Sequence, residues 1–360
     1  MLRIALHPVW RENGARSGGK RMPSPAEQSQ PNPALIFELL NGFQRSAAMK
    51  AAIELDVFTA VGEGNVTPAQ LAKRCGTTER GARILCDYLA IAGILTKEGG
   101  SYALTRDAAV FLDKRSPACI GSIANFITMP RTIDLFMDLT ETLRSGGSSL
   151  AGKAAIEPEN PIWVEFARSM KPMMVMPASL IAEMLGAASG GKWKVLDVAA
   201  GHGVFGITLA KENPNAEIFA LDWPSVLALA KENAQEAGVI SRYHLLPGSA
   251  FDIDLGSGYD LVLLTNFLHH FDAATIEKFL SKVHASLGPR GRAVTLEFVP
   301  NDDRITPPMA ASFSMIMLGQ TPAGDAYTFA EYERMFRKAG FSSSEIRPLP
   351  GPESVIISRK

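Results

Sequence analysis

From about residue 191 the chain alternates between short apolar runs typical of strands and longer runs with helical periodicity. The helical runs include Pro224–Ala237 and Ala273–Leu287. The candidate strands are Lys194–Ala199, Glu217–Asp222, Tyr243–Pro247, Tyr259–Thr265, Arg292–Phe298 and Ser354–Ser358. Strands that are joined through helices form βαβ units, whose strands are parallel. The sequence therefore predicts an α/β domain over residues 191–360, with a doubly wound, mostly parallel sheet.

The first candidate strand leads into the pattern Gly201-x-Gly203-x-x-Gly206. Glycines at this position let the backbone turn tightly and approach a ligand closely. Taken alone, the pattern is a weak signal that would also suit a nicotinamide dinucleotide. Asp197 lies four residues before the first glycine, and a carboxylate there would repel the pyrophosphate of a dinucleotide. S-adenosylmethionine carries a sulfonium and an ammonium group and no phosphate, so the acid favours this ligand.

A second acid, Asp222, ends the next candidate strand, 21 residues after Gly201. An acid at this place can accept hydrogen bonds from both ribose hydroxyls of a bound nucleoside. The alternative is that Asp222 caps or turns into the helix that begins at Pro224. Two acids on either side of a glycine loop are a stronger signal than either acid alone.

A helix, a turn, a second helix and a small hairpin are expected within residues 33–118. Thr67 and Pro68 suit the N-cap and the first position of the first helix, which Gly76 should end. A second helix follows, and Lys97–Thr105 is expected to form a hairpin that turns at two glycines. This order of elements is a winged-helix layout.

The segment 119–190 is again helical in pattern and rich in methionine and aromatic residues. Most such residues pack in helix cores, but clustered methionines and aromatics also form an adaptable wall for a flat organic substrate. The candidates for substrate contact are Phe126, Met129, Phe166, Met170 and, farther along the chain, Met315. Residues 1–32 lack apolar periodicity and are expected to be a disordered extension, within which Met22 is an alternative start.

Over roughly residues 33–360 the chain resembles the plant and bacterial small-molecule O-methyltransferases of the caffeic acid and acetylserotonin types. The more specific marks are Leu268-His269-His270-Phe271-Asp272, Leu296-Glu297-Phe298-Val299-Pro300 and the stretch Thr328–Phe341. The resemblance implies a winged-helix dimerisation domain, a helical connector that lines the substrate pocket, and a Rossmann-like class I methyltransferase domain. It also implies S-adenosylmethionine as the cofactor, a homodimer, and a small aromatic or polyketide-like hydroxylated substrate.

The resemblance further assigns roles to single residues. His269 falls on the position of the general base and Glu297 on the acid that orients it, while His270 is a candidate for substrate contact. The glycine loop, Asp222 and the stretch after Gly248 fall on the cofactor site. The candidate cofactor contacts are Asp197, Gly201, Gly203, Asp222, Trp223, Ser249, Ala250, Phe251, Thr265 and Asn266.

The chain departs from the family pattern at three places. Ser249-Ala250 stands where many relatives have Asp-Met against the adenine, and His269-His270-Phe271 stands where they have His-Asp-Trp. A second acid beside the histidine is common in the plant enzymes, but Ala326 occupies its place here. The sequence leaves open whether the adjacent Asp325 replaces it.

Elementary chemistry supports a histidine base. A phenol with a pKa of about 10 is protonated at neutral pH, and a histidine with a pKa near 6.5 can take the proton as attack begins. Such general-base catalysis typically contributes about 10²–10⁴-fold. His269 and Glu297 each follow or end a candidate strand, so adjacent strand ends could bring them together. A carboxylate on one imidazole nitrogen would leave the other nitrogen basic.

Three other functions compete with this one. A winged-helix DNA-binding regulator is disfavoured because the second helix, within Thr77–Ile91, balances Arg80 and Arg83 against Glu79 and Asp87. A nicotinamide oxidoreductase is disfavoured by Asp197. An S-adenosylmethionine enzyme that methylates carbon or nitrogen, or performs a non-methylating reaction, stays open.

The amino-acid composition limits the partners, the metal content and the compartment that we expect for this protein. The formal net charge of −1 provides no overall field for nucleic acid or an anionic membrane. Three widely spaced cysteines, Cys75, Cys86 and Cys119, do not suggest a disulfide framework or a zinc site. With no apolar run of transmembrane length in the sequence, we expect a cytoplasmic protein that has no membrane partner and needs no metal.

Overall fold

The computed structural model describes residues 31–137, 139–148 and 162–360. The chain divides into two compact units, residues 1–47 and residues 48–360. Of the first unit, the structure describes α1 (Ala34–Leu40) and the beginning of α2 (Gly42–Glu54). The extension predicted over residues 1–32 lies outside the described residues, apart from its last two.

The predicted winged-helix region has the expected elements. They are, in chain order, α3 (Val57–Gly62), α4 (Pro68–Cys75), α5 (Glu79–Ile91), β1 (Leu95–Glu98), β2 (Ser101–Leu104) and α6 (Arg106–Phe111). Thr67 caps α4 through a capping box with Gln70, and Gly76 ends it in the left-handed conformation. The hairpin β1–β2 is antiparallel. Buried side chains such as Phe58 and Tyr102 form a core of this region's own.

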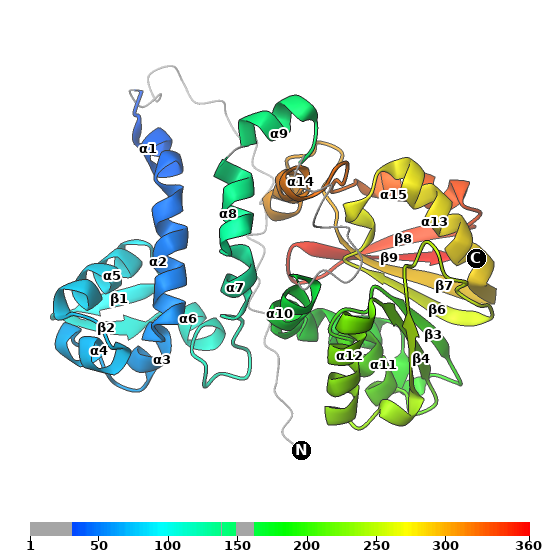
Figure 1. Cartoon of the computed structure of the whole chain (residues 1–360), viewed down its shortest axis with the longest axis horizontal. Helices are drawn as coiled ribbons and strands as arrows, with labels where there is room; N and C mark the ends of the chain where they lie inside the picture. The colour runs from blue at the N-terminus through cyan, green and yellow to red at the C-terminus, as the bar shows by residue number, and fades with distance from the viewer. Residues whose placement is uncertain (1–30, 138, 149–161) are drawn as a thin grey trace, which may run out of the picture. The chain divides into compact units, whose positions relative to one another are not determined.

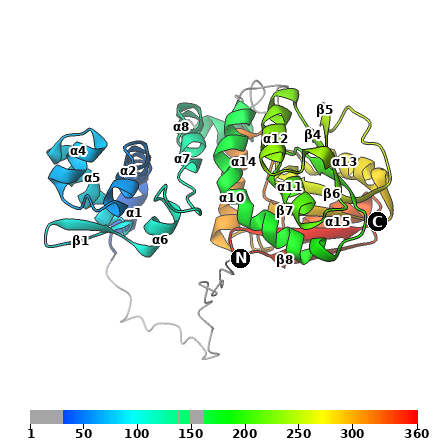
Figure 2. The same cartoon turned by 90° about the horizontal axis from the view of Figure 1, so that it is seen from below.

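A set of helices follows and leads to the sheet. They are α7 (Ile123–Ile127), α8 (Pro130–Met137), α9 (Leu139–Ser145) and α10 (Ile162–Met184), which contains Pro172 and Pro177. The long helix α10 contacts α11 and α12 of the sheet domain, and Figure 2 shows it running beside α11. Its buried face, which includes Met174 and Ile181, belongs to the same core as the sheet.

Seven strands form one sheet in the order β5-β4-β3-β6-β7-β9-β8 (Figure 1). They are β3 (Lys194–Val198), β4 (Glu217–Asp222), β5 (Tyr243–Pro247), β6 (Tyr259–Thr265), β7 (Leu287–Phe298), β8 (Ser343–Pro348) and β9 (Glu353–Arg359). The strands β3 to β7 pair in parallel, whereas β9 runs antiparallel to both β7 and β8. The strand order reverses between β3 and β6, which is where ligands bind in open α/β sheets.

Helices cover both faces of this sheet. They are α11 (Val204–Glu212), α12 (Pro224–Glu236), α13 (Ala273–Ser286), α14 (Pro308–Gln320) and α15 (Phe329–Lys338). One core joins the sheet to α10, α11 and α12, and a second joins its other face to α13 and α15 (Figure 1). This is a Rossmann-like α/β fold with a doubly wound, mostly parallel sheet, as the sequence predicted.

The predicted strands all form, and β4, β5 and β6 have the predicted bounds. The strand β8 was missed. Its sequence, Ser343–Pro348, is polar and its residues are half-buried or exposed, because it is an edge strand without a buried face. In the part of the chain that the structure describes, no helix is long and apolar enough to cross a membrane.

Candidate active site

The glycine loop between β3 and α11 needs its glycines for geometric reasons. Gly201 and Gly203 have φ of 57° and 74°, the left-handed region that favours glycine. A Cβ atom at Gly203 would also lie 2.6 Å from the Tyr243 hydroxyl. The loop therefore combines a left-handed turn with close packing, and it leads directly into the first turn of α11.

Asp197 supports this loop from within the fold. Its side chain is fully buried, and Oδ2 accepts a hydrogen bond of 3.1 Å from the N–H of Gly206, in the first turn of α11. Burial raises the pKa of Asp197 to about 7. Its Oδ1 atom is buried without a hydrogen-bond partner. The structure thus places Asp197 under the loop, where it holds the first turn of α11.

Asp222 joins the ends of β3 and β4. Its Oδ2 accepts from the N–H of Gly201 at 2.8 Å and its Oδ1 from the N–H of Trp223 at 2.7 Å. Burial raises the pKa of Asp222 to about 6. Asp222 does not cap the next helix, because Trp223 is the N-cap residue of α12, but its contact with the Trp223 N–H lies in the turn that leads into this helix. Two buried acids therefore lie at the loop, where a cationic ligand would stabilise their ionised forms.

The stretch after β5 carries three of the predicted cofactor contacts. Ser249 Oγ accepts from the N–H of Phe251 at 3.2 Å, Ala250 is buried and Phe251 is partly exposed. Lys282 of α13 donates to the carbonyls of Ala250 at 3.0 Å and Phe251 at 2.9 Å, and also to that of Ile253. Sequence reasoning missed Lys282, because a lysine within a helix carries no local sign of such a contact.

The turn after β6 holds the last two predicted cofactor contacts. Thr265 is buried, and Asn266 has φ of 53°, an uncommon conformation for a residue other than glycine. The Asn266 amide donates to Met174 Sδ of α10 at 3.5 Å, while its Oδ1 is buried without a partner. His202, in the glycine loop, accepts from the N–H of Val204, and burial lowers its pKa to about 4.

The structure brings His269 and Glu297 together. His269 Nδ1 lies 2.5 Å from Glu297 Oε2, and both side chains are buried. The other carboxylate oxygen of Glu297 accepts from the backbone N–H groups of Phe267 and Leu268 at 3.1 and 2.9 Å. The acid thereby fixes both the turn that carries the histidine and the orientation of its ring. The Nε2 nitrogen of His269 is left for another partner.

His270 stands beside His269, with ring centroids 4.2 Å apart. Its Nδ1 lies 3.1 Å from the carbonyl of Phe267, so Nδ1 carries a proton and Nε2 can accept one. Burial, and next to it the neighbouring His269, lowers the pKa of His270 to about 3. His270 is therefore a neutral hydrogen-bond acceptor at neutral pH.

Aromatic rings extend from the two histidines over several elements. Trp163 of α10 meets His270 edge-on at 5.9 Å and Phe166 at 5.8 Å. Phe126 of α7 continues this row at 4.9 Å from Phe166. From another helix, α14, the ring of Phe313 lies with its centroid 4.9 Å from that of His269. The structure thus joins Phe126 and Phe166 to the histidines, and it adds Trp163 and Phe313, which were not among the predicted contacts.

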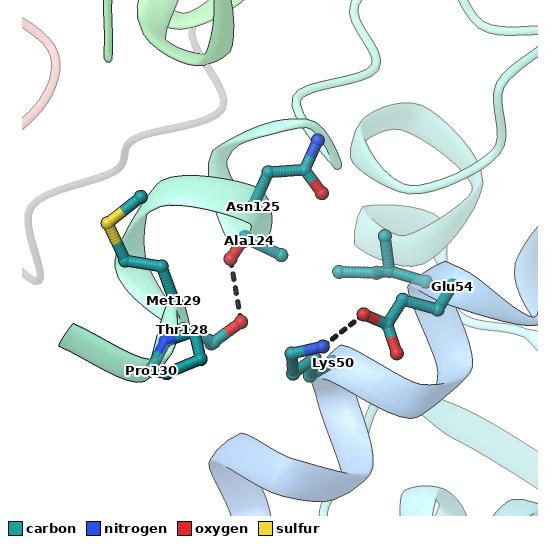
Figure 3. Close-up of a pocket in the computed structure, with 8 residues that line it drawn as sticks. Lys50, Glu54, Ala124, Asn125, Thr128, Met129 and Pro130 are labelled. Carbon is teal, nitrogen blue, oxygen red and sulfur yellow. Dashed lines mark hydrogen bonds and ion pairs between the residues drawn. The ribbon is translucent and has the colours of Figure 1, made fainter. Parts of the chain in front are cut away.

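The three methionines that were predicted to contact the substrate lie in different surroundings. Met129 lines a hollow between α2 and α7, where Lys50 pairs with Glu54 and the Thr128 hydroxyl donates to the Ala124 carbonyl (Figure 3). Met170 is half-buried on α10, and Met315 on α14 is exposed.

The Asp325 side chain is engaged away from His269. Its side chain accepts from the N–H of Ala326 and pairs with Arg304 at 3.2 Å. Only its backbone reaches the site, where its N–H donates to the His269 carbonyl at 3.0 Å. A different acid, Glu353 of β9, is buried near Asn266 and was missed, because nothing in a strand sequence marks an acid that turns inward. Over residues 31–137, 139–148 and 162–360, no group of three metal-ligating side chains is found.

Comparison with known proteins decides the family. The family profile described as the O-methyltransferase domain matches residues 165–342, and the one described as the O-methyltransferase dimerisation domain matches residues 37–114. The chain is 30% identical over 336 residues to the 3-hydroxy-5-methyl-1-naphthoate 3-O-methyltransferase of Streptomyces sahachiroi, which covers 91% of this chain and 95% of the relative. The chain belongs to the S-adenosylmethionine-dependent O-methyltransferases.

Solved structures agree with this assignment. One from Nostoc punctiforme, assigned to the O-methyltransferases, is 52% identical and superimposes with a TM-score of 0.88, covering 92% of this chain and all of that one. Human N-acetylserotonin methyltransferase in complex with S-adenosylmethionine shares the fold at 22% identity, with a TM-score of 0.78 over 92% of this chain and 99% of that one. The predicted resemblance and cofactor are confirmed, and the profile matched by the N-terminal region is that of a dimerisation domain, in agreement with the function that was favoured over DNA binding.

The residues present fit this cofactor. S-adenosylmethionine carries two cationic groups, and the loop presents two acids whose pKa values are raised by burial. The buried and unpartnered Oδ1 atoms of Asp197 and Asn266 lie at the ends of β3 and β6. In open α/β sheets, ligands bind at these carboxyl ends.

Proposed function

We propose that this O-methyltransferase methylates a hydroxyl group of a flat aromatic acceptor, with His269 as the general base and Glu297 as the acid that orients it. The observation that carries the proposal is the buried contact of 2.5 Å between His269 Nδ1 and Glu297 Oε2. The carboxylate holds the proton on Nδ1, so that Nε2 remains free to accept the proton of the acceptor hydroxyl. Bound S-adenosylmethionine supplies the electrophilic methyl group.

We assign a separate role in cofactor binding or proton transfer to each group of site residues. We assign the ribose to Asp222, the adenine to the stretch 249–251, and the methionine end to the glycine loop with Asn266. His269 accepts the proton as the hydroxyl attacks, and the nearby Glu297 stabilises the resulting imidazolium. Correct alignment of the acceptor with the methyl group is expected to supply much of the rate.

The row of rings supports a fused aromatic acceptor. Trp163, Phe166 and Phe126 form a row of ring contacts that begins at His270, and Phe313 meets His269 edge-on. Edge and face contacts of this kind suit a planar ring system. The relative from Streptomyces sahachiroi is named for a hydroxynaphthoate. We therefore propose a hydroxylated naphthoate or polyketide-like acceptor for this chain too.

We also propose that the enzyme is a homodimer through its N-terminal domain. The apolar side chains of α1 are exposed, among them Leu35 at 63% and Leu39 at 72%. A second copy would bury them, as the dimerisation profile suggests. We further propose three domains, which span residues 33–118, 119–190 and 191–360. We also propose that the protein is in the cytoplasm, because all three cysteines are free.

Calorimetric titration with S-adenosylmethionine, S-adenosylhomocysteine and NAD is the first test, on the wild type and on Asp222→Ala. Micromolar binding of both adenosyl ligands that is lost in the variant supports the assigned site. Hydroxynaphthoate acceptors are then assayed with wild type and His269→Ala. Binding of NAD alone, or an unchanged rate in His269→Ala, would contradict the proposal.

A further inference from the structure

The turn that carries His269 has few hydrogen bonds of its own. It is the short 3-10 helix Leu268–His270, a single turn between β6 and α13, and helices of this kind have poor hydrogen-bond geometry. On the side of β6, Glu297 accepts from backbone N–H groups of the turn. Backbone groups inside a protein are ordinarily paired, so the carbonyl groups at the other end of the turn need donors as well.

These donors come from one short segment, residues 324–327, which lies between α14 and α15. The Asp325 N–H donates to the carbonyl of His269 at 3.0 Å. The Tyr327 hydroxyl donates to the carbonyl of Phe271 at 2.8 Å. We call residues 324–327 the clamp, because two of its donors hold two carbonyl groups of the same turn.

Gly324 brings the clamp into close contact with the turn. A Cβ atom at this position would overlap the carbonyl oxygen of His269 and would lie 3.0 Å from the backbone carbon of His270. The Gly324 N–H donates to the Thr321 hydroxyl at 2.8 Å, and this hydroxyl donates to the Met317 carbonyl of α14 at 2.7 Å. The clamp is thus packed against the turn and connected to the end of α14.

The other end of the clamp is fixed by α15 and by Arg304. Tyr327 directly precedes Thr328, which begins α15 in a capping box with Glu331. Arg304, in the loop after β7, donates to both carboxylate oxygens of Glu331, at 2.6 and 2.7 Å. It also pairs with Asp325 at 3.2 Å. A bidentate pair of this kind fixes the geometry of both partners, so the clamp is held from both ends.

The side chain of Tyr327 is suited to a permanent contact with the turn. It is buried, its ring meets that of Tyr332 edge-on at 5.8 Å, and it packs in the core that includes α13 and α15. Burial is the largest of the causes that raise the pKa of Tyr327, so its hydroxyl keeps the proton that it donates. The Tyr332 hydroxyl, in contrast, is buried and has no hydrogen-bond partner within the described residues.

The ring of His269 has one acid to orient it among the residues that the structure describes, namely Glu297. Ala326, which lies between the two donors of the clamp, is buried and brings no polar side chain. The orientation of the ring therefore depends on a single carboxylate and on the position of the backbone that carries the ring.

We propose that Tyr327 is a positioning residue for methyl transfer, which together with the Asp325 N–H keeps the turn of His269 in place. The clamp thereby holds the histidine ring in line with Glu297 and with the hydroxyl group of the acceptor. Since small displacements of reacting groups are costly in rate, a looser turn lowers the rate although every group of the site is still present. This inference rests on the proposed role of His269 as the general base.

The first test needs no acceptor substrate. In the whole protein with isotope-labelled histidine, the proton between His269 Nδ1 and Glu297 should give a far-downfield magnetic resonance signal, because this contact is short and buried. The variant His269→Ala assigns the signal by its loss. In Tyr327→Phe the signal should shift or broaden, whereas in Tyr332→Phe, which removes a hydroxyl without a partner in the described part of the chain, it should stay in place. A signal that is the same in wild type and Tyr327→Phe overturns the proposal.

The second test compares the rate with cofactor binding. With a hydroxynaphthoate acceptor, well below the melting temperature of each variant, Tyr327→Phe should lower kcat about threefold to tenfold, since it removes one hydrogen bond. Its affinity for S-adenosylhomocysteine should stay within about twofold of the wild type, and Tyr332→Phe should change neither quantity. An unchanged kcat in Tyr327→Phe, or an equal loss of kcat and of cofactor affinity, contradicts a role in positioning.

The variant Gly324→Ala displaces the same turn from the clamp side. Its Cβ atom would push against the His269 carbonyl, so we expect kcat to fall at least about tenfold. Gly191→Ala is the matched control, because a Cβ atom at Gly191 meets open space and neither glycine has a positive φ. An unchanged kcat in Gly324→Ala would contradict the clamp. If this variant does not fold, as judged by circular dichroism, Tyr327→Phe still decides.

The outcomes also separate this inference from the proposed function. A wild type without the downfield signal contradicts the contact between His269 and Glu297, and with it the proposed base. A wild-type signal that persists unchanged in Tyr327→Phe contradicts only the role of Tyr327.

Discussion

The two halves of the active site are held in different ways. On the cofactor side, backbone N–H groups hold the acids: Gly206 for Asp197, and Gly201 and Trp223 for Asp222. On the acceptor side, rings from α10 and α14 contact the two histidines, and Phe126 of α7 contacts Phe166 of α10. A site that is held by the backbone depends on main-chain geometry, whereas one that is built from side chains can change its ligand by substitution.

The largest effect that this comparison predicts is the loss of catalysis without loss of cofactor binding. His269→Ala should lower kcat by about 10²–10⁴-fold, since it removes the proposed general base. The affinity for S-adenosylhomocysteine, measured by calorimetry, should change little, because His269 belongs to the acceptor side. Glu297→Gln should lower kcat less, since it keeps the acceptor for the backbone N–H groups of Phe267 and Leu268. A parallel loss of binding in His269→Ala would show that the halves are not separable.

The variant Gly203→Ala tests the cofactor side of the site. The left-handed backbone at position 203 disfavours alanine by about 1–2 kcal/mol. The added Cβ atom would also lie 2.6 Å from the Tyr243 hydroxyl. We expect a lower melting temperature and at least tenfold weaker binding of S-adenosylhomocysteine. Gly238→Ala is the matched control, because Gly238 has φ of 72° but open space around its Cβ position. Equal binding losses in the two variants would assign the effect to backbone strain alone.

Acid pH should weaken the cofactor side selectively. Burial raises the pKa of Asp222 to about 6, so its ionised form is disfavoured in the free protein, and the hydrogen bonds that the ribose hydroxyls would donate to it favour that form. The affinity for S-adenosylhomocysteine should therefore approach its full value about one pH unit above this pKa and be lost as the pH falls, to roughly one half at pH 6 and roughly one tenth at pH 5. Calorimetry on Asp222→Asn should show weak binding whose remaining pH dependence is smaller. A wild-type affinity that does not change between pH 5 and pH 6.5 would contradict an ionised Asp222 as the binding form.

The same division explains what the sequence could predict. The glycine loop, Asp222 and the parallel strands follow from local patterns, because their spacing along the chain determines their geometry. The pairing of His269 with Glu297 was predictable from adjacent strand ends and from the family resemblance. Trp163, Phe313 and Glu353 were not, since each reaches the site from an element whose position depends on tertiary packing. Asp325 shows the converse, as it lies beside the expected position in sequence but pairs with Arg304.

The smallest expected effect concerns Lys282, where a side chain holds a backbone segment of the cofactor side. Its ammonium group donates to the carbonyls of Ala250, Phe251 and Ile253 and so fixes the stretch to which we assign the adenine. Lys282→Met keeps most of the aliphatic length but leaves these carbonyls without their shared donor. Since part of the lysine is open to solvent, water can replace some of the lost bonds.

We therefore expect Lys282→Met to weaken the binding of S-adenosylhomocysteine about threefold to tenfold, with a higher KM for S-adenosylmethionine and little change in kcat. Lys278→Met is the control, because Lys278 lies on the same helix and is exposed. A fall in kcat with unchanged cofactor affinity would mean that the stretch 249–251 positions the acceptor instead of the adenine. The boundary between the two halves of the site would then lie at β5, and the backbone-held half would reduce to the glycine loop and Asp222.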